Sequence, residues 1–428
     1  MPLFSLNPSI IYLNHAAVAP WPQKTVKAVE RFSQENGSVG AQHYPDWLKT
    51  ENHLRRQLAG LINAPTVDDI ALLKNTSEAL SVIAYGLDWK PGENIVSIAQ
   101  EFPSNRIVWE SLSQFGVELR LLDLDQTQDP ENDLTALCDE HTRLISISSV
   151  QYASGLKLNL EQVGRFCADN GILFCVDAIQ SLGAAPFDVQ AFRADIVVAD
   201  GHKWMLGPEG IALFYCRANL RDELKLNQFG WHMVNNAGDF DQVGWTPASS
   251  ARRFECGSPN MLGIHALHAS LEIILETGIE SIQQSIAANT DVIVTEAKRL
   301  GFELITPEEK EKRAGIVTFR VPDVDNEELY QSLMQHGVVC AYRGGGIRFS
   351  PHFHNRPEEI LRAFSIMVVI RVTAMVVIRV TAMVAIRVMA TVATRMLPLP
   401  LLHRLLPNSP SYSLRETPPA PAGFLFVR

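Results

Sequence analysis

The feature that most constrains the fold is an alternation of short apolar runs with helical segments between residues 70 and 215. The runs, rich in β-branched and aromatic side chains, span residues 70–74, 94–99, 144–150, 173–177, 195–200 and 210–215. Helical patterns, such as those at 105–115 and 160–170, lie between several of them. Strands that are apolar along their whole length are typical of parallel sheets covered on both faces. The pattern therefore predicts an α/β fold with a large, mainly parallel sheet.

A second unit follows this sheet. Helical patterns cover residues 260–277 and 282–300, and apolar runs at 315–321, 338–342 and 347–350 surround a helix near 326–335. This order predicts a smaller α+β domain, and a chain of 428 residues is long enough for two domains. We place the large domain, with its N-terminal segment, at residues 1–260 and the small domain at 261–365.

The sequence changes in character after residue 365. The octapeptide MVVIRVTA at 367–374 recurs at 375–382 and, with two changes, at 383–390. Residues 366–428 carry a net charge of +6, whereas the first 365 carry −16. Each arginine in the repeats would cost about 2.5–3.5 kcal/mol at a bilayer centre, which argues against the alternative of a membrane anchor. We interpret residues 366–428 as a non-native or disordered tail, from translated repetitive DNA or a frameshift.

Composition narrows the class of protein further. The net charge of −10 argues against a nucleic-acid partner, which would favour a basic stripe. The six cysteines stand singly, without a CxxC pair or metal-ligand spacing, as in a reducing compartment. The N-terminus shows no secretory signal pattern. We expect a cytoplasmic protein that binds no nucleic acid, membrane or metal.

Two polar residues mark the ends of neighbouring apolar runs. Asp177 ends one run, and Lys203 lies just past the next. Parallel strands would bring this carboxylate and this amine to the same edge of the sheet, where α/β proteins bind ligands. A lysine with a lowered pKa can form an imine with an aldehyde cofactor, and a carboxylate can keep a pyridine nitrogen protonated. Ordinary polar caps on two strands are the alternative.

Several motifs, taken in order, make the chain similar to a known family. They are YLNHAAVAP (12–20), KNTSEAL (74–80), EFPSNRIVW (101–109), VDAIQ (176–180), DGHKW (200–204), RFECGSPN (253–260) and IRFSPHFHN (347–355). Over roughly residues 10–364 the chain resembles the aminotransferase class V family of fold-type I pyridoxal 5'-phosphate (PLP) enzymes. That family includes cysteine desulfurases, selenocysteine lyases and isopenicillin N epimerases. The resemblance implies PLP as cofactor, an amino acid or amine as substrate, and a homodimer.

The resemblance also implies roles around the cofactor. Lys203 is similar to the Schiff-base lysine, Asp177 to the partner of the pyridine nitrogen, and Gln180 to the residue bonded to the phenolic oxygen. His202 is similar to a neighbour of the phosphate. Ser258 is similar to a residue that reaches the phosphate of the partner subunit.

Further residues complete the expected site. Thr76 and Ser77 follow a strand and open a helix, so they can hold a phosphate, cap the helix, or do both. Phe102 is expected to stack on the cofactor ring, with core packing as the alternative. Arg348 resembles the arginine that grips the substrate carboxylate. The other candidates for substrate binding are Asn14, Gln151 and Arg343.

Three departures from the family's desulfurases bear on the reaction. Phe102 stands where those enzymes carry a histidine. Asp200 stands where relatives carry a small hydroxyl residue, and we expect it to be structural because a carboxylate would repel the phosphate. The segment from Arg343 to Arg348 contains three glycines and no cysteine, which predicts a mobile loop without a nucleophile.

We therefore expect epimerase-, lyase- or aminotransferase-type chemistry at the substrate α carbon, through an imine on Lys203. One alternative is a cysteine desulfurase or selenocysteine lyase that uses a non-standard cysteine, Cys340 or Cys256. The other alternative is a catalytically inactive protein on the same fold.

Overall fold

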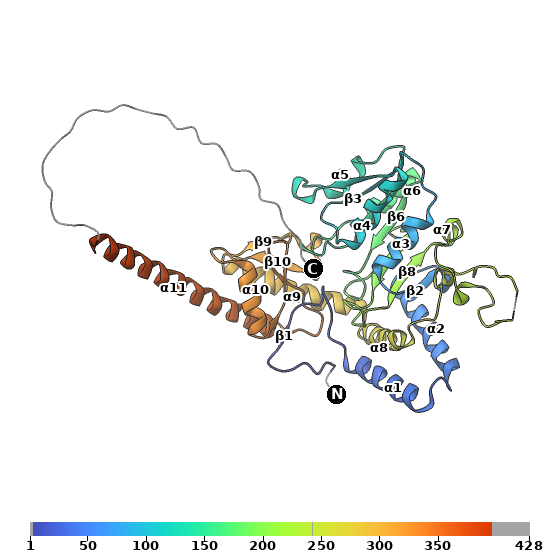
Figure 1. Ribbon diagram of the computed structural model, residues 1–428, viewed down its shortest axis with the longest axis horizontal. Helices are drawn as coiled ribbons and strands as arrows, with labels where there is room; N and C mark the ends of the chain where they lie inside the picture. Colours follow the sequence, from blue (N-terminus) through green and yellow to red (C-terminus); the bar gives the residue numbers. More distant parts are fainter. Residues whose placement is uncertain (1–2, 242, 396–428) are drawn as a thin grey trace. The chain divides into compact units, whose positions relative to one another are not determined.

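The computed structural model describes residues 3–241 and 243–395. Backbone contacts divide the chain into two units, Met1–Met375 and Val376–Arg428, and the first unit holds every sheet found among the described residues (Figure 1). The expected division of that unit at residue 260 stays a prediction.

The larger part of the first unit is built on a seven-stranded sheet, in the order β2-β8-β7-β6-β5-β3-β4. Its strands are β2 (Ile70–Leu73), β3 (Asn94–Ile98), β4 (Glu118–Leu122), β5 (Thr142–Ser148), β6 (Leu173–Asp177), β7 (Ile196–Asp200) and β8 (Ala212–Cys216). Only β8 runs antiparallel to its neighbours, so the expected mainly parallel sheet is confirmed. The sequence analysis did not predict the edge strand β4, because its side chains are exposed or half-buried and two of them are charged.

Successive side chains along the strands fill two separate cores, one on each face of this sheet. Leu144 belongs to the core beneath α3 (Thr76–Gly86) and α4 (Ser104–Glu110). Its neighbour Ile145 belongs to the core shared with three other helices: α2 (Tyr44–Leu61), α6 (Leu160–Asn170) and α8 (Met261–Thr277). Helix α1 (Gln23–Val39) lies against α8, and α5 (Pro130–Ala136) and α7 (Ala218–Glu223) are short.

The smaller part contains a four-stranded antiparallel sheet in the order β12-β13-β10-β9. The strands are β9 (Glu303–Leu304), β10 (Val317–Arg320), β12 (Ala341–Arg343) and β13 (Gly346–Phe349). Its core is completed by α9 (Ile279–Arg299), α10 (Asn326–Gln335) and the first turns of α11 (Pro357–Arg395). The N-terminal strand β1 (Ile11–Tyr12) pairs with β11 (Val338–Val339), so the start of the chain packs with this smaller part.

The octapeptide repeats lie in α11, which is helical to Arg395. This differs from the disordered tail that the sequence favours, and the described helix contains no glycine or proline after Pro357 that would end it. Met367 is buried in the small core, and the Arg371 guanidinium lies 5.6 Å from the ring centroid of Phe302. The remainder of the expected tail, 396–428, lies outside the described residues. Among the helices described, none is long and apolar enough to cross a membrane.

Two fully buried histidines link the N-terminal segment, the chain after β13 and the segment that follows Lys203. His15 Nδ1 lies 3.0 Å from the carbonyl oxygen of Ser350, and His352 Nε2 lies 3.0 Å from that of Trp204. Their ring centroids are 5.3 Å apart. Burial lowers the pKa of His352 to about 4 and that of His15 well below its ordinary value. Both imidazoles are therefore neutral in the folded protein at neutral pH.

Acidification is expected to destabilise the protein through these histidines. The pKa of a histidine in the unfolded chain is about 6.5. Between about pH 6.5 and 4 the unfolded state therefore binds more protons than the folded state. The free energy of unfolding falls as the pH falls through that range. We expect a loss of about 2 kcal/mol or more between pH 7 and 5, measured by urea unfolding. His352→Gln, which can keep the donor to Trp204, should flatten the profile. A wild-type stability independent of pH in this range would contradict the account.

Candidate active site

Lys203 and Asp177 lie at the same edge of the large sheet, where the parallel strands β6 and β7 end. Both are buried, and Lys203 is only 8% exposed. Burial lowers the pKa of the Lys203 amine to about 8; the charge of Asp177 opposes this shift, and the charge of Arg348 adds to it. Burial also raises the pKa of Asp177, against the backbone N–H of Ile179, which hydrogen-bonds to its carboxylate. An amine that loses its proton more readily than an ordinary lysine, as imine formation requires, thus lies in the same buried region as an acid group.

Phe102 lies beside this lysine. Its ring centroid is 5.5 Å from Lys203 Nζ, and Tyr152 meets it edge to face at 5.3 Å. Phe102 is 42% exposed, so packing in the core does not explain its position. Stacking of Phe102 on a cofactor ring stays a prediction, and an exposed aromatic ring next to Lys203 is consistent with it.

The start of helix α3 offers an anion site. The cap of the helix is Asn75, whose side chain accepts a hydrogen bond from the backbone N–H of Glu78 at 2.8 Å. Thr76 is therefore free of the capping role, and its buried hydroxyl has no hydrogen-bond partner among the described residues. The Ser77 hydroxyl lies 2.8 Å from that of Ser104. A helix start with free N–H groups and an unpartnered hydroxyl suits a phosphate.

The residues flanking Lys203 are tied into the fold. His202 Nδ1 lies 2.9 Å from Asp200 Oδ1, so Asp200 faces a neighbouring side chain, as its expected structural role requires. Gln180 donates to the carbonyl oxygen of Ala16 at 3.1 Å and accepts from Trp204 Nε1 at 2.8 Å. Gln180 thereby joins the N-terminal loop to the lysine segment. Its second amide N–H stays available for the predicted phenolic oxygen.

Arg348 comes from β13 and is almost fully buried. Its guanidinium donates to the carbonyl oxygen of Tyr152 at 2.7 Å and to Asn14 Oδ1 at 3.5 Å. No carboxylate pairs with it among the described residues, and burial lowers its pKa to about 10. A buried cation without an anionic partner is costly, and a bound carboxylate would supply the missing charge. The structure thus brings Asn14 and Arg348 together as the sequence analysis expects.

Gln151 is oriented by an acid that the sequence analysis did not single out. Its Nε2 donates to Glu101 Oε1 at 3.0 Å, and Glu101 also accepts from the backbone N–H and hydroxyl of Ser148. The side-chain amide oxygen of Gln151, Oε1, is buried and has no partner among the described residues. The negative charge of Glu101 also helps to raise the pKa of Asp177. The sequence signal that could have identified Glu101 is its position shortly after a buried strand, in the motif EFPSN.

The segment between the two arginines is a tight hairpin, whereas the sequence suggests a mobile loop. Arg343 pairs with Gly346 in the β12–β13 register, and both intervening glycines have positive φ, +57° and +74°. This is the two-residue turn in which left-handed residues match the strand twist. A Cβ at position 346 would lie 2.5 Å from the carbonyl oxygen of Phe319. The three glycines are therefore explained by a turn and a close strand contact.

Ser258 is exposed, in the loop that follows Glu255. Glu255 is held by the Arg55 guanidinium at 2.5 Å, and Glu51 binds the same guanidinium. Glu51, Glu255 and His232 are the one group of metal-ligand type side chains within 4.8 Å of one another in the described chain. Since Arg55 already bridges the two carboxylates, this cluster is an ion-pair network that fixes the loop. The reach of Ser258 to a partner subunit stays a prediction.

The two candidate sulfur acceptors differ in exposure. Cys340 is buried, and burial raises the pKa of its thiol to about 12. Cys256 is half-buried, and its thiol donates to Gln228 Oε1 at 3.2 Å. A thiol with a raised pKa is a poor nucleophile near neutral pH, so Cys340 is unsuited to sulfur transfer.

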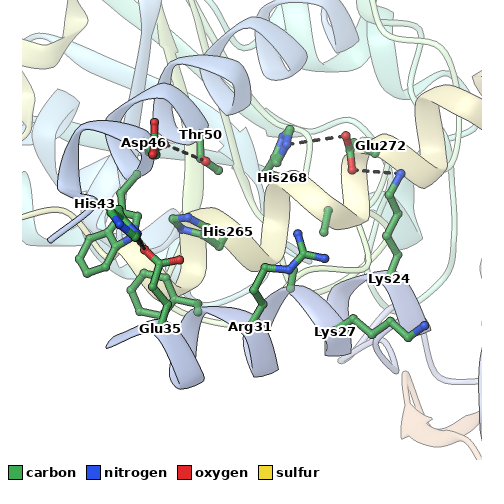
Figure 2. Close-up of a pocket in the computed structure, with 14 residues that line it drawn as sticks. Lys24, Lys27, Arg31, Glu35, His43, Asp46, Thr50, His265, His268 and Glu272 are labelled. Carbon is green, nitrogen blue, oxygen red and sulfur yellow. Dashed lines mark hydrogen bonds and ion pairs between the residues drawn. The ribbon is translucent and has the colours of Figure 1, made fainter. Parts of the chain in front are cut away.

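A separate pocket of about 460 Å³ lies between α1, α2 and α8 (Figure 2). Ion pairs lie within it: Lys24 bonds to Glu272 at 3.0 Å, and His43 lies 3.4 Å from Glu35. It contains none of the residues that the sequence analysis assigns to the site. We therefore place the candidate active site at the strand ends.

The residues at the strand ends fit PLP. A buried lysine with a lowered pKa, a buried acid and a helix start with an unpartnered hydroxyl would supply the amine, the pyridine partner and the phosphate contacts. On a mainly parallel sheet they define a fold-type I PLP enzyme. The chain belongs to the Aminotransferase class-V family, whose sequence model matches residues 11–363.

Relatives and solved structures agree with this assignment. The chain is 30% identical over 374 residues to a probable cysteine desulfurase from Methanothermobacter thermautotrophicus, covering 82% of this chain and 92% of that protein. The apo structure of a cysteine desulfurase from Thermococcus onnurineus superposes with a TM-score of 0.76 at 24% identity, covering 84% and 94% of the two chains. The structure of a cysteine desulfurase from Escherichia coli superposes with a TM-score of 0.75 at 23% identity, covering 86% of this chain and 97% of that chain. The protein is thus a PLP-dependent enzyme.

Proposed function

We propose that the protein acts on the α carbon of an amino acid, by epimerisation, elimination or transamination, and forms no persulfide on its own cysteines. The observation that supports this most strongly is the β12–β13 hairpin, which lies beside Arg348 and closes through Gly344 and Gly345 without a thiol. Lys203 is the acid–base group in this proposal, because Phe102 carries no transferable proton.

In this proposal some side chains bind the substrate and others transfer or hold a proton. Arg348 and Asn14 bind the substrate carboxylate, and this fixes the α carbon relative to Lys203. When bound, PLP supplies an electron sink that weakens the bonds to that carbon. The Lys203 amine, whose pKa burial lowers, removes a proton from the α carbon or returns one to it. Asp177 would hold the proton on the pyridine nitrogen of bound PLP, and Glu101 orients Gln151 through a hydrogen bond.

We also propose a cytoplasmic homodimer in which Ser258 reaches the partner's cofactor phosphate. The loop before Ser258 exposes Phe229 by 63%, Phe240 by 79% and Trp245 by 57%, an apolar surface that a second copy would cover. Light scattering on the cofactor-loaded protein is expected to give the mass of a dimer, and Ser258→Ala to weaken cofactor retention. A monomer that binds cofactor stoichiometrically and turns over substrate would contradict the proposal.

Incubation with L-cysteine tests the proposed chemistry against a desulfurase. The names of the similar proteins favour the desulfurase as a second candidate. We expect no stoichiometric persulfide by intact-protein mass spectrometry, since Cys340 is buried and the hairpin has no thiol. Cys340→Ala and Cys256→Ala serve as controls. A persulfide lost in one of these variants, together with alanine production, would restore the desulfurase.

A further inference from the structure

The register of the small sheet places two arginines on one face. Ala341 lies opposite Arg348, and Arg343 lies opposite Gly346. Directly opposed residues point to the same face, as do residues two apart on one strand. Arg343 therefore shares the face of Arg348, as its diagonal neighbour across the hairpin, a position within reach of long side chains.

Neither guanidinium has an acidic partner among the described residues. Arg348 contacts only the Tyr152 carbonyl oxygen and Asn14, and Arg343 donates to the carbonyl oxygen of Tyr342 at 2.7 Å. The charge of Arg343 helps to lower the pKa of Arg348 and of the Lys203 amine. Both arginines thus act electrostatically on the reactive lysine.

A third arginine on the same face behaves differently. Thr318 lies opposite Arg348, and Arg320 is two residues further along β10, so Arg320 also points to this face. Arg320 is neutralised by Glu303 at 3.2 Å. Arg320 and Arg343 lie on the two strands that flank β13. Of these two arginines, Arg343 is the one without an acidic partner among the described residues.

We propose that Arg343 binds a second acidic group on the substrate, which makes the substrate a short α-amino acid with a carboxylate or similar anion on its β or γ carbon. The inference rests on the proposed function, in which Arg348 binds the α-carboxylate. A four- or five-carbon dicarboxylic skeleton can span two diagonal guanidinium groups, and its two charges would relieve their mutual repulsion. A monocarboxylic amino acid would leave Arg343 unpaired. The register of the hairpin and its glycine turn fix the backbone at Arg343, and the neighbouring Gly344 lies beside Ala153, whose Cβ would lie 3.6 Å from a Cβ at position 344.

The test compares succinate with butyrate, which has the same chain length and one carboxylate fewer. Binding of each to the cofactor-loaded protein is measured by titration calorimetry, so the readout does not depend on turnover. Wild type is expected to bind succinate about tenfold more tightly than butyrate. This ratio corresponds to the weaker hydrogen bonds between charged groups, because Arg343 is exposed to solvent. Arg343→Ala is expected to reduce succinate to the butyrate affinity and to leave butyrate unchanged. Arg320→Ala, the matched control, is expected to keep the preference.

Two results would overturn the inference: a wild type that does not distinguish the two acids, or equal losses in Arg343→Ala and Arg320→Ala. The visible band of the cofactor on Lys203, and its loss on borohydride reduction, are recorded for each protein. A missing band contradicts the proposed function itself. A normal band without discrimination contradicts only the role of Arg343.

Discussion

Lys203→Ala is expected to abolish both turnover and the covalent retention of the cofactor. Lys203 is buried, its amine has a lowered pKa, and it lies at the strand edge next to Phe102. Alanine removes the nitrogen that, in the proposed function, binds the aldehyde and moves the proton. The loss of general acid–base catalysis alone is worth on the order of 10²–10⁴ in rate. The measurement is the visible spectrum after dialysis, together with the rate on the best amino acid substrate.

Lys74→Ala provides the control for this variant. Lys74 also lies in one of the family-like motifs, but its side chain is 74% exposed and pairs with Glu78. It is expected to keep the visible band and most of the rate. If Lys203→Ala instead retained a covalent adduct that borohydride can reduce, the amine would belong to a different lysine.

Asp177→Asn should separate cofactor binding from catalysis. The amide has the volume of the acid but cannot stabilise a proton on the pyridine nitrogen, so the cofactor becomes a poor electron sink. We expect the covalent linkage to Lys203 to persist while the rate falls on the order of 10²–10³-fold, comparable to the loss of a preorganised electrostatic contact. The linkage is checked by borohydride reduction and the rate by steady-state kinetics.

Asp200→Asn is the matched variant at the end of the neighbouring strand. Because Asp200 faces His202 at 2.9 Å, its replacement is expected to cost much less activity than that of Asp177. Equal losses in the two variants would mean that position 177 has no special relation to the cofactor.

The large sheet and the location of the candidate site could be predicted from the sequence because their signals are local. Helix α6 begins and ends at Leu160 and Asn170, as its pattern predicts. Asp177 and Lys203 follow apolar runs that become adjacent parallel strands, so their meeting follows from the topology alone. The family-like motifs then supplied roles that spacing could not.

Other features depend on contacts that no local pattern encodes. Glu101 and Gln151 are 50 residues apart in the chain, and their hydrogen bond requires both strand ends to be in place. The pairing of β1 with β11 joins the two ends of the first unit. The glycines after Arg343 suggest mobility until the register shows that they form a turn.

The most direct test of the account is to trap the cofactor on the wild-type protein. The purified protein, loaded with PLP, is reduced with borohydride, digested, and mapped by mass spectrometry. We predict a visible absorption band that disappears on reduction and a single phosphopyridoxyl adduct, on Lys203. A protein without such a band, or an adduct on any other lysine, would contradict the assignment of Lys203 and with it the proposed function.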